Sequence, residues 1–155
     1  MKTKYATRTV LLDKNDRVAV INVRLHKYYK IPGGGVEDGE DLEPSAKREV
    51  LEESGCACEI IAQLGRIETD ILEWEMHDVS DGFIARVIGE KKLPEFETHE
   101  SDRGFCLEWH ENLTSAIRTI KANVVSDPDA AALQFRDLEF LRLAEKYLDT
   151  EKEIR

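Results

Sequence analysis

The sequence predicts an α/β fold, a sandwich of helices around a mixed β-sheet, and three observations support this prediction. The length of 155 residues suits one domain with a real hydrophobic core. Short runs rich in Val, Ile and Leu indicate strands. Helical segments stand between and after these runs, as in other α/β proteins. We expect residues 1–150 to form a single domain and residues 151–155 to be a frayed tail.

The predicted strands are bounded by residues that favour turns. Asn15 and Asp16 lie between the first two apolar runs, so these runs should pair as a hairpin. An extended segment at 28–31 ends at Pro32, and the three glycines that follow have a backbone free to adopt conformations that other residues resist. A polar loop spans 91–102. Strands are expected at 7–13, 17–24, 58–67, 71–76, 82–88 and 105–109.

The predicted helices are marked by end signals and by apolar spacing. Pro44 fits the first turn of a helix, and Gly55 fits the position directly after its end. The last predicted helix has spaced apolar residues, from Leu133 to Ala144. It can either cover the sheet or form the interface of a homodimer. Helices are expected at 43–54, 113–123 and 130–148.

The composition limits the classes of partner. The formal net charge is -10, and a strongly acidic surface repels the phosphates of a nucleic-acid polymer. Small phosphorylated substrates stay compatible with this charge, provided that metal ions bridge the like charges. We therefore expect a small substrate and no nucleic-acid polymer as partner.

The cysteines and the N-terminus bear on location. Cys56, Cys58 and Cys106 are an odd number without a CxxC pair, so they indicate neither a disulfide framework nor a zinc site. The first residues contain no apolar run long enough for a signal peptide or a membrane span. We expect a cytoplasmic protein with no membrane partner.

Three carboxylates gather on one face of the helix predicted at 43–54. Glu49, Glu52 and Glu53 stand at i, i+3 and i+4, a spacing that places them side by side. Each like-charged i,i+4 pair costs an isolated helix about 0.2–0.5 kcal/mol. Taken alone, this face suits either a solvated acidic surface or a site for a hard cation, because Mg²⁺ and Mn²⁺ prefer oxygen ligands.

The neighbouring residues favour the cation site. A glycine turn next to the helix lets backbone groups approach a metal or a phosphate. Arg48 adjoins the carboxylates and can hold one of them by a bidentate contact. Glu40, in the preceding acidic loop, can brace Arg48 or the loop itself.

This stretch resembles the Nudix box, written G-x5-E-x7-R-E-U-x-E-E-x-G-U, where U is apolar. All seven fixed positions match. The one soft departure is a cysteine at the last U, and cysteine is itself a small hydrophobe. The resemblance extends to KIPGGG before the box and to DGFIARVIGE and CLEW after it, and covers most of residues 5–125. The box residues are Gly34, Glu40, Arg48, Glu49, Val50, Glu52, Glu53, Gly55 and Cys56.

The resemblance implies an α/β/α sandwich that hydrolyses a nucleoside diphosphate linked to another moiety. Two or three Mg²⁺ or Mn²⁺ ions would bridge the diphosphate and lower the pKa of the attacking water. By position, Arg48 and Glu40 would support the metal ligands. The implied ligands are the side chains of Glu49, Glu52 and Glu53 and the carbonyl group of Gly33.

The resemblance also implies one more carboxylate, as a general base or a further ligand, from a loop well after the box. That loop is LPEFETHESDRGF here. We favour Glu100 for this role, with Glu97 and Glu53 as alternatives. The plain alternative for the loop carboxylates is that they only make an exposed loop soluble.

The substrate needs cations for its phosphates and a surface for its base. Arg24 and Lys30 are the preferred phosphate-binding candidates, followed by Arg8, because all three lie on or near strands that lead into the glycine turn. Tyr28 can stack on a base, although an aromatic residue at a strand end usually serves packing.

The substrate subgroup is suggested by absences. The sequence lacks the proline typical of ADP-ribose hydrolases, the upstream motif of the coenzyme A subgroup and the SQPWPFPxS motif of the NADH subgroup. These absences favour a (d)NTP or a modified NTP. The alternatives are hydrolysis of ADP-ribose, a nucleotide sugar or a dinucleotide, a non-catalytic nucleotide-binding protein, and an acidic calcium-binding domain.

Overall fold

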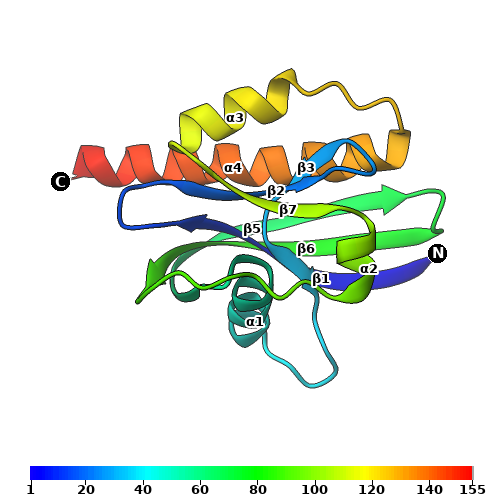
Figure 1. The fold of residues 1–155 in the computed structure, drawn as a ribbon, viewed down its shortest axis with the longest axis horizontal. Coiled ribbons are helices and arrows are strands. Elements are labelled where there is room, and N and C mark those ends of the chain that lie inside the picture. Colours follow the sequence, from blue (N-terminus) through cyan, green and yellow to red (C-terminus); the bar gives the residue numbers. More distant parts are fainter. Residues whose placement is uncertain (155) are drawn as a thin grey trace.

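Seven strands form one mixed sheet in the computed structural model, which describes residues 1–154, and helices cover both faces of the sheet (Figure 1). The strand order is β3-β2-β1-β6-β5, with β4 paired to β1 and β7 paired to β2. The predicted α/β/α sandwich with a mixed sheet is confirmed. The strands are β1 (Lys2–Leu12), β2 (Val18–Val23), β3 (Tyr28–Lys30), β4 (Gly33–Gly35), β5 (Ala57–Ile71), β6 (Met76–Ile88) and β7 (Phe105–His110). The helices are α1 (Leu42–Ser54), α2 (Thr98–Asp102), α3 (Leu113–Ala122) and α4 (Pro128–Ile154).

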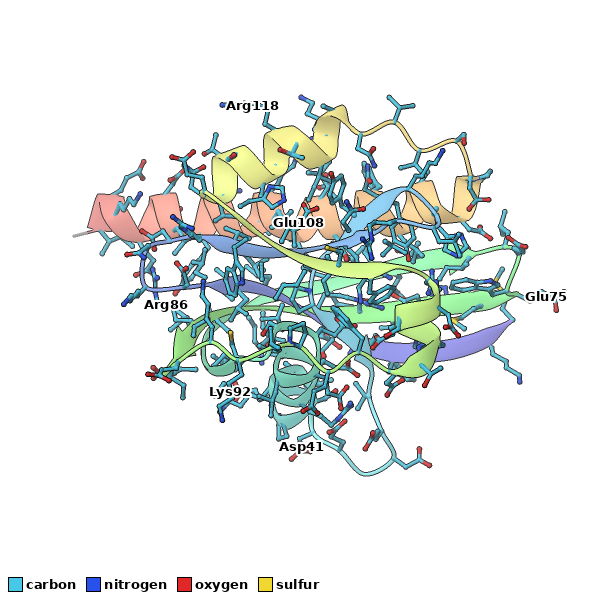
Figure 2. The ribbon with its side chains drawn as sticks, viewed as in Figure 1. Asp41, Glu75, Arg86, Lys92, Glu108 and Arg118 are labelled. Carbon is cyan, nitrogen blue, oxygen red and sulfur yellow. The ribbon has the colours of Figure 1, made fainter. Side chains whose placement is uncertain are left out.

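Strand β1 connects the parts of the sheet. It pairs in parallel with β6 along its whole length, from Lys2 opposite Met76 to Leu12 opposite Arg86. On its other side it pairs antiparallel with β4, and its end meets the start of β2 in the predicted hairpin. Glu75, in the turn between β5 and β6, lies beside the N-terminus, where its carbonyl group accepts the N–H of Lys2 at 3.1 Å (Figure 2).

Apolar side chains fill both faces of the sheet. Helices α3 and α4 lie on one face, and α1 lies on the other (Figure 1). The helix predicted at 130–148 therefore covers the sheet. Within residues 1–154, no helix combines the length and the apolar character needed to span a bilayer. Towards α4 the core contains Val10, Val20, Ile84, Phe140 and Leu141, and towards α1 it contains Leu11, Ala19, Val50, Cys56 and Ala85.

The prediction of a separate strand at 71–76 is wrong. Strand β5 continues to residue 71, residues 72–75 form a turn, and β6 starts at residue 76. The two strands pair antiparallel along one long hairpin that is interrupted by two irregularities in register. The apolar residues Leu72 and Trp74 favoured a strand in the sequence, but they are exposed residues of the turn.

Three other boundaries differ from the prediction. Strand β1 begins at Lys2 rather than at residue 7, because pairing with β6 orders a polar segment that has no apolar pattern. The polar loop predicted at 91–102 contains the short helix α2. Residues 151–154, expected to fray, continue α4 as helix, while residue 155 lies outside the described residues.

Gly82 is required by the packing of α4 on the sheet. A Cβ atom at this position would lie 2.4 Å from ring atoms of the fully buried Phe140. We predict that Gly82→Ala lowers the free energy of unfolding by about 1–3 kcal/mol, because the ring has to shift in a close-packed core. Urea denaturation measures this loss. Adding Phe140→Leu should recover part of it, and strictly additive losses in the double variant would contradict the proposed clash.

Candidate active site

A cavity of about 300 Å³ is lined by residues of β1, β4, α1, α2, β7 and α4. Its walls differ in chemistry. Helix α1 and helix α2 contribute carboxylates, β1 and α4 contribute cationic side chains, and β7 with the turn between β5 and β6 contributes aromatic rings. The cavity is therefore suited to a ligand that carries both negative charge and a flat ring.

The glycines of β4 bring the backbone close to the carboxylates of α1. A Cβ atom on Gly33 would lie 2.1 Å from the carbonyl oxygen of Thr7, and one on Gly34 would lie 2.6 Å from Oε1 of Glu49. The three glycines belong to a strand that pairs with β1. Gly33 and Gly34 are needed here because a side chain would not fit, not for the unusual backbone conformations that we expected from the sequence.

A buried ion pair lies behind this strand. The side chain of Glu53 is fully buried, and its carboxylate accepts the N–H of Gly33 at 2.9 Å. The ammonium group of Lys30 lies 3.1 and 3.2 Å from its two oxygens. The same ammonium donates to the carbonyl oxygen of Gly33 at 3.0 Å. One cation thus contacts two of the groups that the family resemblance assigns to a metal.

Glu100 is a second carboxylate near Glu53, and its side chain is buried. Burial raises the pKa of Glu53, and the nearby Glu100 raises it further, whereas the ammonium group of Lys30 lowers it. The N–H of Glu97 also donates to Oε1 of Glu100 at 2.9 Å and fixes its orientation. The side chain of Glu97 itself is exposed, so the geometry favours Glu100 as the loop carboxylate.

Arg48 holds Glu49 in place. Its guanidinium group binds Glu40 through two contacts of 2.9 Å, and it donates to Oε1 of Glu49 at 3.0 Å and to the carbonyl oxygen of Gly35 at 3.0 Å. These hydrogen bonds lower the pKa of Glu40 to about 2. The bracing expected from the sequence is therefore present, and it ties the acidic loop, the glycine strand and α1 together.

Glu52 differs from the other two box glutamates. Its side chain is about one-third exposed, and one oxygen lies 3.5 Å from Nη1 of Arg48. Across residues 1–154, no three side chains of His, Cys, Asp or Glu come close enough to share a metal ion. The three glutamates lie on adjoining positions of α1, and cations of the protein pair with all of them: Arg48 with Glu49 and Glu52, and Lys30 with Glu53.

The donor groups nonetheless fit a hard divalent cation. The available donors are carboxylate and carbonyl oxygens, which are the ligands that Mg²⁺ and Mn²⁺ prefer. The carboxylate of Glu53 and the carbonyl of Gly33 already bind a cation, the ammonium of Lys30. The oxygens are thus oriented towards positive charge. Glu49, Glu52, Glu53 and the Gly33 carbonyl group are the residues that would hold such an ion.

Cationic side chains line the same cavity. Arg8 and Arg136 are both buried, and Asp78 lies between them, 3.7 Å from Arg8 and 3.2 Å from Arg136. Arg136 also pairs with the buried Asp137 at 2.8 Å. Burial lowers the pKa of Arg8, and the nearby Arg136 adds to this effect. Lys4 lines the cavity as well, so three cations meet two buried carboxylates here, and an anion bound beside them would be stabilised.

An aromatic cluster surrounds Arg103 at another part of the cavity. The guanidinium carbon lies 5.7 Å from the ring centroids of Trp74 and Phe105 and 6.0 Å from that of Tyr28. Arg103 also donates to the hydroxyl oxygen of Tyr28 at 2.8 Å. These distances are those of cation–π contacts. A planar base can stack on such a surface.

The structure brings most of the predicted residues together. Glu53 lies next to the cavity, where it accepts the N–H of Gly33. Glu40 and Glu52 contact Arg48, which itself lines the cavity. Arg24 is placed elsewhere, since its Nε binds the carbonyl oxygen of Gly104 and it does not line the cavity. The predicted residues that line the cavity are Arg8, Tyr28, Lys30, Gly33, Gly34, Arg48, Glu49, Glu97 and Glu100.

Several cavity residues were not proposed as site residues from the sequence, among them Trp74, Lys4, Arg103 and Arg136. Trp74 lies half-exposed at the hairpin turn. Lys4 and Arg103 carried no motif signal. Arg136 belongs to α4, far along the chain from the box, and only the folded structure brings it near Asp78.

The acidity of Glu40 leads to a testable pH dependence. Its pKa is about 2 in the folded protein, against an ordinary value of 4.5, so the ionised form contributes stability above pH 4.5, and this contribution disappears as the pH falls towards 2. Glu40→Gln should therefore lower the melting temperature at neutral pH, and its difference from wild type should shrink in acid. Thermal unfolding of both proteins between pH 7 and pH 2 measures this difference in melting temperature. Glu43→Gln, at an exposed position of α1, is the control, and a difference that stays constant in acid would contradict the assignment.

Comparison with known proteins identifies relatives of this chain. A family model described as the NUDIX domain matches residues 2–126. An RNA pyrophosphohydrolase from Novosphingobium aromaticivorans is 36% identical over 61 residues, which are 39% of this chain and 35% of that protein. The match therefore spans about a third of the length of this relative.

Solved structures resemble the whole fold. The MutT protein of Methanosarcina mazei Go1 has a TM-score of 0.64 at 18% identity, covering 94% of this chain and 96% of that one. The Ap4A hydrolase of C. elegans has a TM-score of 0.65 at 16% identity, covering 96% and 99%. At these identities the likeness concerns the fold alone.

Proposed function

This chain is a member of the Nudix family, whose domain matches residues 2–126, and we propose on this basis that it hydrolyses a phosphoric anhydride bond in a small nucleotide-like substrate. The observation that supports this proposal most directly is the mixture of charges in one cavity. Glu49 and Glu100 line this cavity together with Arg8 and Arg136. A diphosphate in the cavity can contact the cations directly and needs divalent ions to approach the carboxylates.

Mg²⁺ or Mn²⁺ held by Glu49, Glu52, Glu53 and the Gly33 carbonyl group would polarise phosphorus and acidify the attacking water. The residues of the chain supply the rest. Arg48 keeps the carboxylate of Glu49 oriented. The carboxylate of Glu100 accepts the proton of the attacking water in this proposal, with Glu97 and Glu53 as the alternatives. Because Glu100 is buried and hydrogen-bonded to the Glu97 N–H, it is better placed than the exposed Glu97.

The substrate that we favour is a (d)NTP or a modified NTP. Its phosphates would contact Arg8, Arg136 and Lys4, and its base would stack beside Trp74 and Arg103. Hydrolysis of ADP-ribose, a nucleotide sugar or a dinucleotide is the alternative, together with binding without hydrolysis. The three free cysteines agree with a reducing, cytoplasmic location. A homodimer is part of the same proposal.

A second candidate substrate is the 5′-triphosphate end of RNA. The name of the Novosphingobium relative favours it, although only 61 residues are matched. The net charge of -10 opposes contacts with a long polymer. A 5′ end that enters the cavity alone would require few such contacts, so the chain length of the RNA distinguishes the two cases.

A substrate screen tests the proposal. The protein is incubated with Mg²⁺ or Mn²⁺ and a panel of NTPs, modified NTPs, ADP-ribose, nucleotide sugars, dinucleoside polyphosphates and a 5′-triphosphorylated RNA. Mass spectrometry of the products in ¹⁸O-labelled water identifies the substrate and the phosphorus atom attacked. Metal-dependent turnover of one class supports the proposal. Binding of nucleotides without any turnover would support the non-catalytic alternative.

Glu53→Gln should reduce kcat by about a hundredfold or more, the scale of losing one catalytic group. The amide still accepts and donates hydrogen bonds in the same volume, so the fold should persist in circular dichroism. Glu59→Gln, at an exposed position of β5, is the matched control. Wild-type turnover in Glu53→Gln would remove Glu53 from the catalytic set.

Trp74→Leu should raise KM by about tenfold with little change in kcat, because stacking on a base contributes about 1–3 kcal/mol. Steady-state kinetics with the best substrate of the screen measure both constants. Leu72→Ala, in the same turn, is the control and should leave KM unchanged. A loss confined to kcat would contradict a base-binding role for Trp74.

A further inference from the structure

The ammonium group of Lys30 contacts oxygens that we propose as metal ligands. It lies 3.0 Å from the carbonyl oxygen of Gly33 and 3.1 and 3.2 Å from the two carboxylate oxygens of Glu53. These oxygens belong to the proposed metal ligands. The side chain of Lys30 is buried together with Glu53, so water does not screen this contact.

The ammonium and a divalent ion exclude one another at these oxygens. Mg²⁺ approaches its oxygen ligands to about 2.1 Å. An ion at that distance from the Gly33 carbonyl and the Glu53 carboxylate would overlap the ammonium of Lys30, and their like charges would repel strongly in a buried site. One of the two has to leave.

Lys30 has a place to move into. Its side chain lines the cavity, and its ammonium lies 5.1 Å from the ring centroid of Phe105. The cavity is also the space proposed for the diphosphate. A lysine that leaves Glu53 would therefore present its charge to the substrate phosphates.

We propose that Lys30 is a resident cation at the metal position, and that metal binding drives its ammonium away from Glu53 into the cavity, towards the substrate diphosphate. This inference rests on the proposed function. Lys30 has two roles in this scheme: it balances Glu53 in the metal-free protein, and it contacts the phosphates once metal is bound. Metal and diphosphate should each increase the affinity for the other, because coupling between two ligands is reciprocal.

The movement is measured on the wild-type protein by NMR of lysine side chains labelled with ¹³C at Cε. Lys30→Arg, which keeps the positive charge, assigns the Lys30 signal by its disappearance. On titration with Mg²⁺ alone, the Lys30 signal should shift in step with metal binding measured by calorimetry. Lys4 lines the same cavity without contacting Glu53, and its signal should move less.

A second measurement compares metal affinity. Lys30→Met should bind Mn²⁺ about tenfold or more tightly than wild type, a change of about 1.4 kcal/mol, because it removes the competing cation. Lys4→Met removes the same charge from the same cavity and should have a clearly smaller effect. If Lys30→Met does not fold, Lys30→Gln retains a hydrogen bond to Glu53 and serves instead.

The outcomes separate this inference from the proposed function. Saturable Mg²⁺ binding without any change in the Lys30 signal would overturn the inference and leave a metal-dependent hydrolase intact. Equal Mn²⁺ affinity in Lys30→Met and wild type would overturn it as well. Absence of Mg²⁺ binding together with turnover of no member of the substrate panel would overturn both.

Discussion

The burial of one carboxylate, that of Glu53, constrains the arrangement of the whole cavity. A charge with no exposure to solvent is costly unless it is paired and hydrogen-bonded. Its partners, Lys30 and the N–H of Gly33, come from the segment of β3 and β4. Because β4 also pairs with β1 opposite Arg8, satisfying this carboxylate fixes helix α1 against the centre of the sheet. The helix, the glycine strand and the cationic wall are therefore held as one unit.

The distribution of charge resolves an apparent conflict between an acidic protein and a phosphorylated substrate. The net charge of -10 describes the surface as a whole, but a ligand in the cavity experiences the local field. There the cations of β1 and α4 line the same cavity as a carboxylate of α1. Arg48 further limits the acidic wall by binding Glu40 and Glu49 together. A site of this kind selects small anions that bring their own counterions.

The sequence predicted the parts of the site that depend on local spacing. The carboxylates of α1 and the Arg48 contacts follow from a helical repeat and a continuous motif. Arg24 was misplaced, because proximity along the chain to the glycine segment did not determine which way the strand end faces. Arg136 was missed because it comes from α4 and reaches the cavity only through tertiary packing. The prediction also made β1 too short and divided the β5–β6 hairpin into separate strands. Cross-strand pairing orders these segments, although their own apolar pattern is weak or misleading.

The parallel pairing of β1 with β6 also has a consequence for the order of assembly. Lys2 lies opposite Met76, so β1 has no parallel neighbour until β6 has been synthesised. Contacts of such high sequence separation form slowly, because a long loop has to close first. Arg8 reaches the cavity from β1 and Arg136 from α4, so the proposed anion site is incomplete until α4 has emerged from the ribosome and docked on the sheet.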